Sequence, residues 1–186
     1  ELEALFSVST TLRTVRSTDE MLPVVLKEMR RVLDADAGAI VLLDTDQSHF
    51  TIMLSDGLLA ANTGLRFPSS EGLSGKVFRT HQPCVVEDIS QAPDRLPGVI
   101  GEETLGPEAI VPLQSETEML GVLIAERKKG APRFSPEDIR LLSVLGEMTG
   151  NTLRRTRLYD QALNRQEIPT PLAQLRHLPR YLKAVT

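Results

Sequence analysis

The chain has 186 residues, of which 41% are hydrophobic and 25% are charged, and its formal net charge is −4. This composition is ordinary for a soluble globular protein, and the length suits one domain with extensions. Because the net charge is negative, the sequence gives no electrostatic footprint for nucleic acid or for an anionic membrane, and we expect neither as a partner.

The first predicted element is a helix with a narrow apolar seam. Leu5, Val8, Leu12 and Val15 are spaced three and four residues apart, as in a heptad repeat. Because the seam is narrow, we expect residues 1–17 to form a signalling or dimerisation helix that meets one partner helix. The chain does not begin with Met, and its helical pattern is present from the start, so we expect it to be a piece of a longer protein.

A second helix is predicted directly after the first. Ser17 or Asp19 can cap it, and acidic residues in its first turn suit the helix dipole. Its apolar residues form one broad face, which we expect to pack on a sheet. They are Leu22, Val25, Leu26, Met29, Val32 and Leu33.

Short apolar runs between polar turns predict the strands. AGAIVLL, at Ala37–Leu43, is apolar throughout and indicates a strand buried on both faces. A hairpin partner is expected at Phe50–Leu54, and Pro112 in a later strand suggests a sheet edge or a bulge. The other predicted strands are Leu65–Phe67, Cys84–Glu87, Ala109–Leu113 and Leu120–Ala125.

The stretch Glu71–Pro83, EGLSGKVFRTHQP, predicts a short helix with glycines at its start. Two interpretations of Gly72 and Gly75 stay open. The glycines can form a tight turn and let the helix approach its neighbours closely. Alternatively, the backbone amides around Leu73–Gly75 can offer an anion or carbonyl site at a helix N-terminus. Further along, Asp88–Gly106 is expected to be a long, partly helical connection.

The last predicted helix is long. Ser135 can be its N-cap, and Pro136 suits the first helical position. Its apolar stripe is wide at first and sparse later, so we expect the helix to pack on the sheet and then run on, exposed, toward a partner. Residues 163–186 are expected to be a tail or the start of a further segment.

The order of these elements indicates a fold class. Hairpin neighbours point to an antiparallel sheet, and helices gathered at the two ends of the sequence point to one covered face. This is an α+β layer architecture.

Cys84 is the single cysteine of the chain. Since no disulfide can form within the chain, a reducing cytoplasm is the expected compartment. No apolar run approaches the length of a membrane span, and no signal peptide is recognisable.

Several motifs, in this order, resemble the GAF domain family, a sensory module of bacterial signalling proteins, phosphodiesterases and phytochromes. The similarity covers roughly residues 18–158 and rests on the combination of motifs. The motifs are DADAGAIVLLD at Asp34–Asp44, EGLSGKVFRTHQPCVVEDIS at Glu71–Ser90, AIVPL at Ala109–Leu113, LGVLIAERKKG at Leu120–Gly130 and RFSPEDIRLLSVLG at Arg133–Gly146.

The resemblance implies a six-stranded antiparallel sheet with the N- and C-terminal helices packed on one face and a ligand pocket on the other. It implies a non-catalytic GAF domain at residues 18–162, within a larger signalling protein of the histidine kinase or a similar kind. We expect a small-molecule ligand of unknown identity, no metal and no cofactor. The candidate pocket residues are Phe67, Leu73, Ser74, Gly75, Phe78, Ile89 and Val99.

The resemblance also implies a homodimer. In the family, the terminal helices form a parallel bundle that relays a signal to an output domain. The alternative is that these apolar residues only complete the core. The candidate interface residues are Leu5, Val8, Leu12, Val15, Leu145, Met148, Leu153 and Tyr159.

The residues give little support to the other ligands and reactions that are known in the family. Members that bind cyclic GMP carry an Asn-Lys, Phe and Asp-Glu signature, and the matching positions here are Glu126, Arg127, Phe134, Asp138 and Ile139. Only the Phe and the Asp are kept, and Phe134 and Asp138 also suit a structural role at the start of a helix. Bilin attachment through Cys84 has the neighbouring His81 on the wrong side, and heme ligation by a histidine lacks support. Methionine sulfoxide reduction needs two thiols, so we expect no enzyme activity. A relay domain without any ligand stays open as an alternative, and a cyclic-nucleotide-binding GAF domain as a weaker one.

Overall fold

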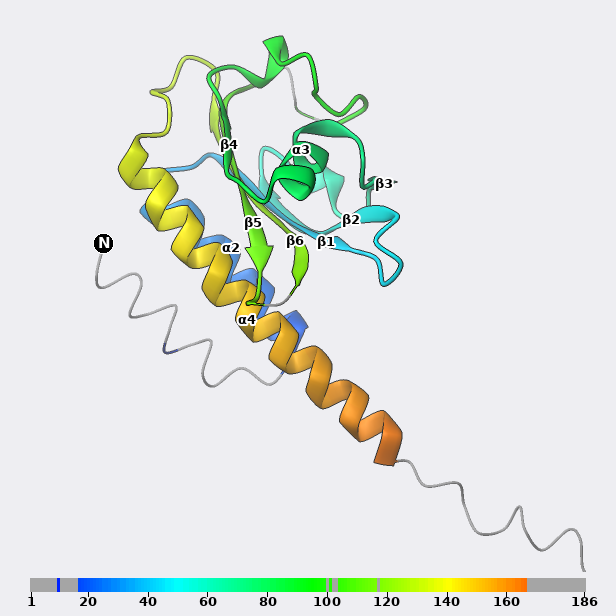
Figure 1. Ribbon diagram of the computed structural model, residues 1–186. Helices are drawn as coiled ribbons and strands as arrows, with labels where there is room; N and C mark the ends of the chain where they lie inside the picture. Colours follow the sequence, from blue (N-terminus) through cyan, green and yellow to red (C-terminus); the bar gives the residue numbers. More distant parts are fainter. Residues whose placement is uncertain (1–9, 11–16, 100, 102–103, 117, 167–186) are drawn as a thin grey trace, which may run out of the picture.

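The computed structural model describes residues 10, 17–99, 101, 104–116 and 118–166, with side chains described as far as residue 158. Within this part of the chain lies a six-stranded antiparallel sheet of order β3-β2-β1-β6-β5-β4 (Figure 1). The predicted α+β fold is therefore confirmed. The strands are β1 (Ala37–Leu43), β2 (His49–Gly57), β3 (Arg66–Pro68), β4 (Cys84–Val86), β5 (Leu105–Gln114) and β6 (Met119–Lys128). The helices are α2 (Thr18–Val32), α3 (Gly72–Thr80) and α4 (Pro136–Gln166), with short 3₁₀ helices η1 (Ala60–Asn62) and η2 (Ile89–Gln91).

The first strand has its predicted bounds, and three others are longer than predicted. β2 runs past Leu54 to Gly57, β5 starts four residues before Ala109, and β6 ends at Lys128. The apolar runs underestimated these strands because polar residues continue the pairing. Glu108 of β5, for example, is the register partner of Glu126 of β6.

Pro112 lies in β5, the second strand from the edge of the sheet, and has no amide hydrogen to donate to a neighbouring strand. It pairs with Val122 of β6, while the edge strand β4 pairs with β5 only at Glu108–Ile110. The outer side of β5 at Pro112 therefore has no neighbouring strand. β5 is therefore not an edge strand as a whole, but the proline lies beyond the part of β5 that pairs with β4.

Helices α2 and α4 lie side by side across one face of the sheet (Figure 1). Their buried side chains, with those of alternate strand residues, form one hydrophobic core. Helix α4 crosses β5 at unusually close range: a Cβ atom at Gly146 would lie 2.8 Å from the Pro112 oxygen, and one at Gly150 would lie 2.4 Å from the Gln114 oxygen. Glycine at both positions therefore lets the helix backbone rest on the strand backbone.

Both long helices begin at side-chain caps. The Ser17 hydroxyl accepts a hydrogen bond from the Glu20 amide at 3.3 Å. At the start of α4, the Ser135 amide donates to the Asp138 carboxylate at 2.9 Å, and the Asp138 amide donates to the Ser135 hydroxyl at 3.1 Å. This reciprocal pair is a capping box, so the structural role expected of Asp138 is confirmed.

Arg127 ties the end of β6 to both long helices. The residue is only 9% exposed, and its side chain donates hydrogen bonds to the carbonyl oxygens of Leu33 at 2.6 Å and Pro132 at 3.0 Å. It also reaches the Asp138 carboxylate at 3.3 Å and lies 4.3 Å from the centre of the Phe134 ring. The guanidinium thus replaces water for several carbonyl groups at the junction of α2, β6 and α4.

The predicted dimer interface needs correction on α4. Leu145 and Leu153 are 1% and 0% exposed, because they face the sheet and belong to the helix-side core. They are core residues of the single chain and not interface residues. Met148 is partly buried against the same core, and the side chain of Tyr159 lies outside the described residues. The residues predicted for the first helix, Leu5, Val8, Leu12 and Val15, also lie outside them.

Replacing Arg127 should destabilise the fold strongly. We expect Arg127→Met to lower the free energy of unfolding by about 2–4 kcal/mol, because it leaves buried carbonyl groups without donors. Urea unfolding followed by circular dichroism measures this. The matched control is Arg140→Met, since Arg140 and its partner Glu137 are 73% and 63% exposed and the pair contributes at most about 1 kcal/mol. Equal losses in the two variants would contradict the role given to Arg127.

Candidate functional site

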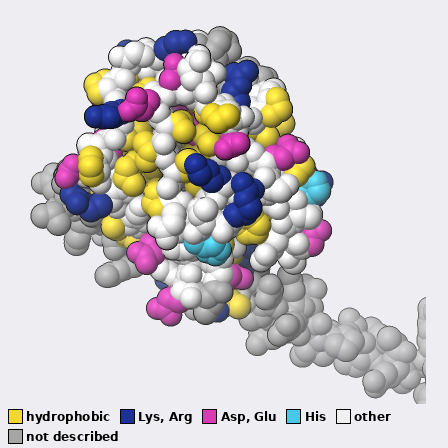
Figure 2. Space-filling view, turned by 45° about the horizontal axis from the view of Figure 1, so that its top comes forward, with side chains coloured by type: hydrophobic (Ala, Val, Ile, Leu, Met, Phe, Trp, Pro, Cys, Tyr) yellow, Lys and Arg dark blue, Asp and Glu magenta, His cyan; other side chains and the backbone are white. Residues whose placement is uncertain are grey.

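The second face of the sheet is covered by short elements. Helix α3, the two 3₁₀ helices and the segment that leads from η2 to β5 form this layer (Figure 1). Together with the sheet they form a second hydrophobic core. Hydrophobic side chains reach the surface in the upper part of the face seen in Figure 2, among basic and acidic ones.

A cavity of about 60 Å³ lies between this layer and the sheet. Its floor comes from the central strands, where alternate residues point to this side. The floor residues are Ala39 and Val41 of β1, Glu108 and Ile110 of β5, and Ile124 and Glu126 of β6. The other walls include Ile52, Leu59, Phe67, Gly72, Leu73, Ser74, Ile89, Leu96, Val99 and Leu105.

The sequence of β1 explains why the floor is hollow. Ile40 and Leu42 point to the helix layer, while Ala37, Ala39 and Val41 point to the cavity side. Alanine is the smallest side chain that still continues a strand surface. It therefore leaves a space that the larger residues of α3 and of the covering segment do not fill.

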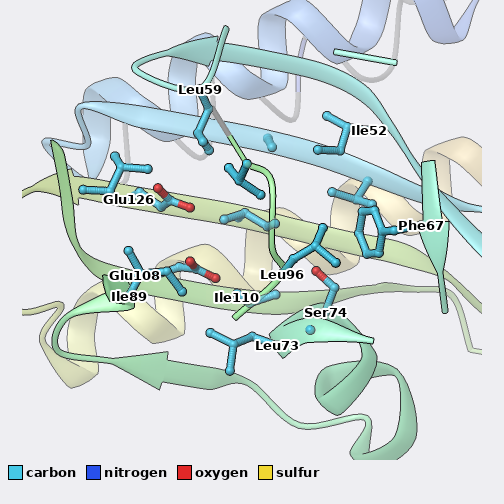
Figure 3. A pocket seen from close by; sticks show the side chains of 16 residues that line it. Ile52, Leu59, Phe67, Leu73, Ser74, Ile89, Leu96, Glu108, Ile110 and Glu126 are labelled. Atoms are coloured by element: carbon cyan, nitrogen blue, oxygen red, sulfur yellow. The ribbon is translucent and has the colours of Figure 1, made fainter. Parts of the chain in front are cut away.

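Three polar side chains interrupt the apolar lining: Ser74 of α3 and the two glutamates of the floor. Glu108 and Glu126 are each 5% exposed, and they are register partners on neighbouring strands. Figure 3 shows both carboxylates on the floor and the Ser74 hydroxyl on the opposite wall. An apolar cavity with a few convergent polar groups is the usual form of a small-molecule site.

Five of the seven predicted pocket residues line this one cavity. They are Phe67, Leu73, Ser74, Ile89 and Val99. Gly75 and Phe78 do not line it. The Phe78 ring packs on Phe50 at 5.9 Å, within the same hydrophobic core but outside the cavity lining.

The two glycines of α3 have different structural reasons. Gly72 has a φ of +69°, a conformation that other residues rarely adopt. Gly75 packs against the preceding turn, where an added Cβ would lie 2.6 Å from the Ser70 carbonyl carbon. The backbone geometry at Gly72 and Gly75 therefore supports the first interpretation, a tight turn and a close approach of the helix to its neighbours.

The sequence reasoning missed the acidic floor of the cavity. Glu108 and Glu126 each interrupt a strongly apolar strand, and this was the signal that could have found them. A charged residue within such a strand is buried whichever face it occupies. Leu96 was missed because the covering segment has no periodicity that shows which residues point inward.

The partial cyclic GMP signature does not assemble in one place. Glu126 faces the cavity, but Arg127, Phe134 and Asp138 lie together in the helix layer on the other side of the sheet. Successive residues of a strand point to opposite faces, so Glu126 and Arg127 cannot both contact one ligand.

The remaining candidate chemistry is weak in the described residues. Cys84 is buried at the start of β4, and burial raises the pKa of its thiol. His81 is exposed and ends α3 in the left-handed conformation with a φ of 55°. In the part of the chain that the structure describes, no cluster of three or more His, Cys, Asp or Glu residues is arranged to hold a metal, and no helix is long and apolar enough to cross a membrane.

Fold and cavity together define a class of protein: a six-stranded antiparallel sheet with two long helices on one face and a small, mainly apolar cavity under short elements on the other. The model of the GAF domain family matches residues 15–154. The chain belongs to the GAF domain family.

Proteins with similar amino-acid sequences include two that are named as regulatory proteins. The Nif-specific regulatory protein of Herbaspirillum seropedicae is 31% identical over 165 residues, which is 81% of this chain and 29% of that protein. The protein of the same name from Azospirillum lipoferum is 25% identical over 174 residues, or 90% of this chain and 28% of that protein. The chain thus spans less than a third of the length of these relatives.

Solved structures share the fold. The GAF domain of a phosphoenolpyruvate-protein phosphotransferase from Coxiella burnetii superposes with a TM-score of 0.78 at 22% identity, covering 86% of this chain and 96% of that one. A free methionine-R-sulfoxide reductase from Neisseria meningitidis, in complex with its substrate, gives 0.73 at 20% identity, covering 85% and 90%. Structures with this fold therefore include a GAF domain of a phosphotransferase and a methionine sulfoxide reductase.

The Cys84 thiol should be unreactive in the folded protein. Because burial raises its pKa, less of the thiol is ionised at a given pH, and the rate of alkylation should rise only at a higher pH than for an exposed cysteine. Iodoacetamide labelling between about pH 7 and 10, with and without urea, measures this. Equal rates in the folded and unfolded protein at neutral pH would contradict the prediction.

Proposed function

We propose that this chain is a non-catalytic sensory domain that binds a small molecule in the cavity between α3 and the sheet. The observation that carries the proposal is the cavity itself: its lining is mainly apolar, and it holds a hydroxyl and two carboxylates. A packed core has no need of such polar groups.

The proposed signal passes through the sheet to the helix layer. On β6, Ile124 and Glu126 line the cavity, whereas Leu123 and Ala125 pack in the helix-side core. A ligand that favours one arrangement of the floor therefore changes the relative stability of helix arrangements on the other face. This is a population shift between states that differ in their affinity for the ligand.

The size of the cavity limits what the described arrangement can hold. At about 60 Å³ it is several-fold smaller than the roughly 300–1,000 Å³ typical of drug-sized ligands. A larger ligand requires the covering segment with Leu96 and Val99 to move outward. We take the structure as the closed form of the site.

The output of the signal is proposed from the relatives. The match covers only 29% and 28% of the full length of the two Nif-specific regulatory proteins. The chain would therefore be one domain of such a regulator. This replaces the histidine kinase expected from the family resemblance as the favoured context. We also propose a reducing, cytoplasmic location, which the single cysteine of the chain supports.

The second part of the proposal is dimerisation through helices. The exposed side of α4 carries Val144 and Leu158, which are 40% and 54% exposed and lie four turns apart. With Met148 they replace Leu145 and Leu153 as interface candidates, beside the seam predicted for residues 1–17. A relay domain that dimerises without a ligand remains the second candidate function, favoured by the small size of the cavity.

Filling the cavity should abolish ligand binding. Ala39 lies on the floor and is 1% exposed, so Ala39→Ile occupies the space with added carbon atoms, at a cost in stability of about 1–3 kcal/mol. Native mass spectrometry of freshly purified protein should show a small-molecule mass on the wild type and none on this variant.

The matched control for that experiment is Ala39→Gly, which enlarges the cavity and should retain the ligand. A wild-type protein that carries no ligand and takes up none from a cell extract would favour the second candidate function, a relay domain that dimerises without a ligand. A ligand retained by Ala39→Ile would place the binding site elsewhere.

Breaking the exposed seam of α4 should weaken the dimer. We expect Leu158→Glu to raise the dimer dissociation constant at least about tenfold, since a charge at a helix–helix contact costs more than about 1.4 kcal/mol. Light scattering over a concentration series measures this. Met53→Glu is the control, because Met53 is 42% exposed on β2 and is not part of α4. An unchanged oligomer in Leu158→Glu would remove α4 from the interface.

A further inference from the structure

Helix α3 begins without a side-chain cap, whereas α2 and α4 both have one. The side chain of its N-cap residue, Glu71, accepts no hydrogen bond from the first turn. The first backbone bond of the helix runs from the Gly75 amide to the Glu71 oxygen at 3.0 Å. The amides of Gly72, Leu73 and Ser74 come before it and have no partner among the described residues. The start of α3 therefore offers free backbone donors.

These three residues line the cavity, and Ser74 adds a free side-chain group to the backbone donors. Ser74 is 6% exposed, and its hydroxyl points from α3 into the cavity (Figure 3). This hydroxyl forms no hydrogen bond with any described residue. The other polar side chains of the lining, those of Glu108 and Glu126, each have an interaction within the protein. Ser74 is therefore the polar side chain of the lining whose hydrogen-bonding capacity is unused.

The free groups at this wall suit a ligand that accepts hydrogen bonds. Backbone N–H groups only donate, and a serine hydroxyl can donate as well. A buried donor without a partner costs free energy, so a ligand that supplies an acceptor gains from each donor that it pairs. A carbonyl oxygen has two lone pairs and can accept from the hydroxyl and from one amide together.

The charge of the acceptor group follows from the rest of the lining. A helix N-terminus also attracts anions, but a carboxylate held away from water needs a positive side chain nearby. Among the described residues that line the cavity there is no Lys, Arg or His. A neutral carbonyl oxygen accepts the same hydrogen bonds and loses less hydration when it is buried. The lining therefore favours a neutral acceptor over an anionic one.

We propose that the cavity selects a small neutral molecule with a carbonyl group, such as a ketone, an ester or an amide, on a short apolar body. The carbonyl oxygen accepts hydrogen bonds from the Ser74 hydroxyl and from the first turn of α3. The apolar body lies among residues such as Phe67, Leu96 and Ile124. Ser74 is then a residue that determines the specificity of the site. This inference rests on the proposed function and names the class of ligand for the same cavity.

The test compares three probes of nearly equal size: 2-butanone, 2-methyl-1-butene and sodium propionate. The alkene has a CH₂ group in place of the carbonyl oxygen, and propionate has a negative charge. Titrations of backbone amide chemical shifts give the dissociation constants. In the wild-type protein, 2-butanone should move the amide proton signals of Leu73 or Ser74 downfield, as a new hydrogen bond does. The alkene should bind without this shift, and propionate should not bind.

A single substitution isolates the hydroxyl. We expect Ser74→Ala to weaken 2-butanone binding about fivefold to tenfold and to leave the alkene within about twofold. The matched control is Ser70→Ala, because Ser70 is exposed in the turn before α3 and does not line the cavity. It should change neither constant. The urea midpoint of Ser74→Ala should be equal to that of the wild type or higher, because an unpaired hydroxyl contributes nothing to the fold.

The outcomes separate this inference from the function on which it rests. Equal 2-butanone affinity in the wild type and Ser74→Ala would overturn the carbonyl site, and so would propionate binding in the cavity. The sensory function would stand in both cases, because a small molecule still occupies the site. A lowered urea midpoint in Ser74→Ala would show that the hydroxyl has a partner within the fold and would also overturn the inference.

Two further results decide the remaining cases. If Ser74→Ala does not fold, the downfield shift with 2-butanone in the wild type, or its absence, still tests the hydrogen bond. Binding of no probe would overturn the carbonyl site. If the freshly purified protein also carries no ligand in native mass spectrometry, the proposed function fails with it.

Discussion

The whole structure depends on a sheet that is buried on both faces. All seven residues of β1 are buried, as are nine of the ten in β5. Because successive strand residues point to opposite faces, each central strand supplies two separate cores. A change of packing in one core can therefore alter the packing of the other core through adjacent residues of a single strand, and no loop is needed to transmit it.

The two layers that cover this sheet differ in how firmly they are held. The helix layer contains two long helices, glycine contacts of α4 with the backbone of β5, and the Arg127 junction. The cavity layer consists of one nine-residue helix, two 3₁₀ helices and an irregular segment. Short elements with few hydrogen bonds open at lower free energy than long packed ones. The layer that meets the ligand is thus the one that can adapt.

What the sequence predicted well was what periodicity and capping determine locally. The bounds of β1, the caps at Ser17 and Ser135 and the α+β class follow from patterns that tertiary contacts do not alter. Leu145 and Leu153 were misassigned because an apolar stripe shows that a helix buries one side, but not whether a sheet or a second helix covers it. Phe78 was misassigned because an apolar residue of α3 can join the core around Phe50 without reaching the cavity itself.

The acidic floor of the cavity also bears on the choice between a ligand-binding domain and a relay without a ligand. Register fixes the glutamates: a slip of one residue would move the whole apolar set of a strand to the wrong face. Within the observed register, Glu108 and Glu126 place two carboxylates side by side in a nearly dry space. A domain that only needed a packed core would be more stable with apolar residues there. Local conflicts of this kind are expected at functional sites, where stability is lost for the sake of binding.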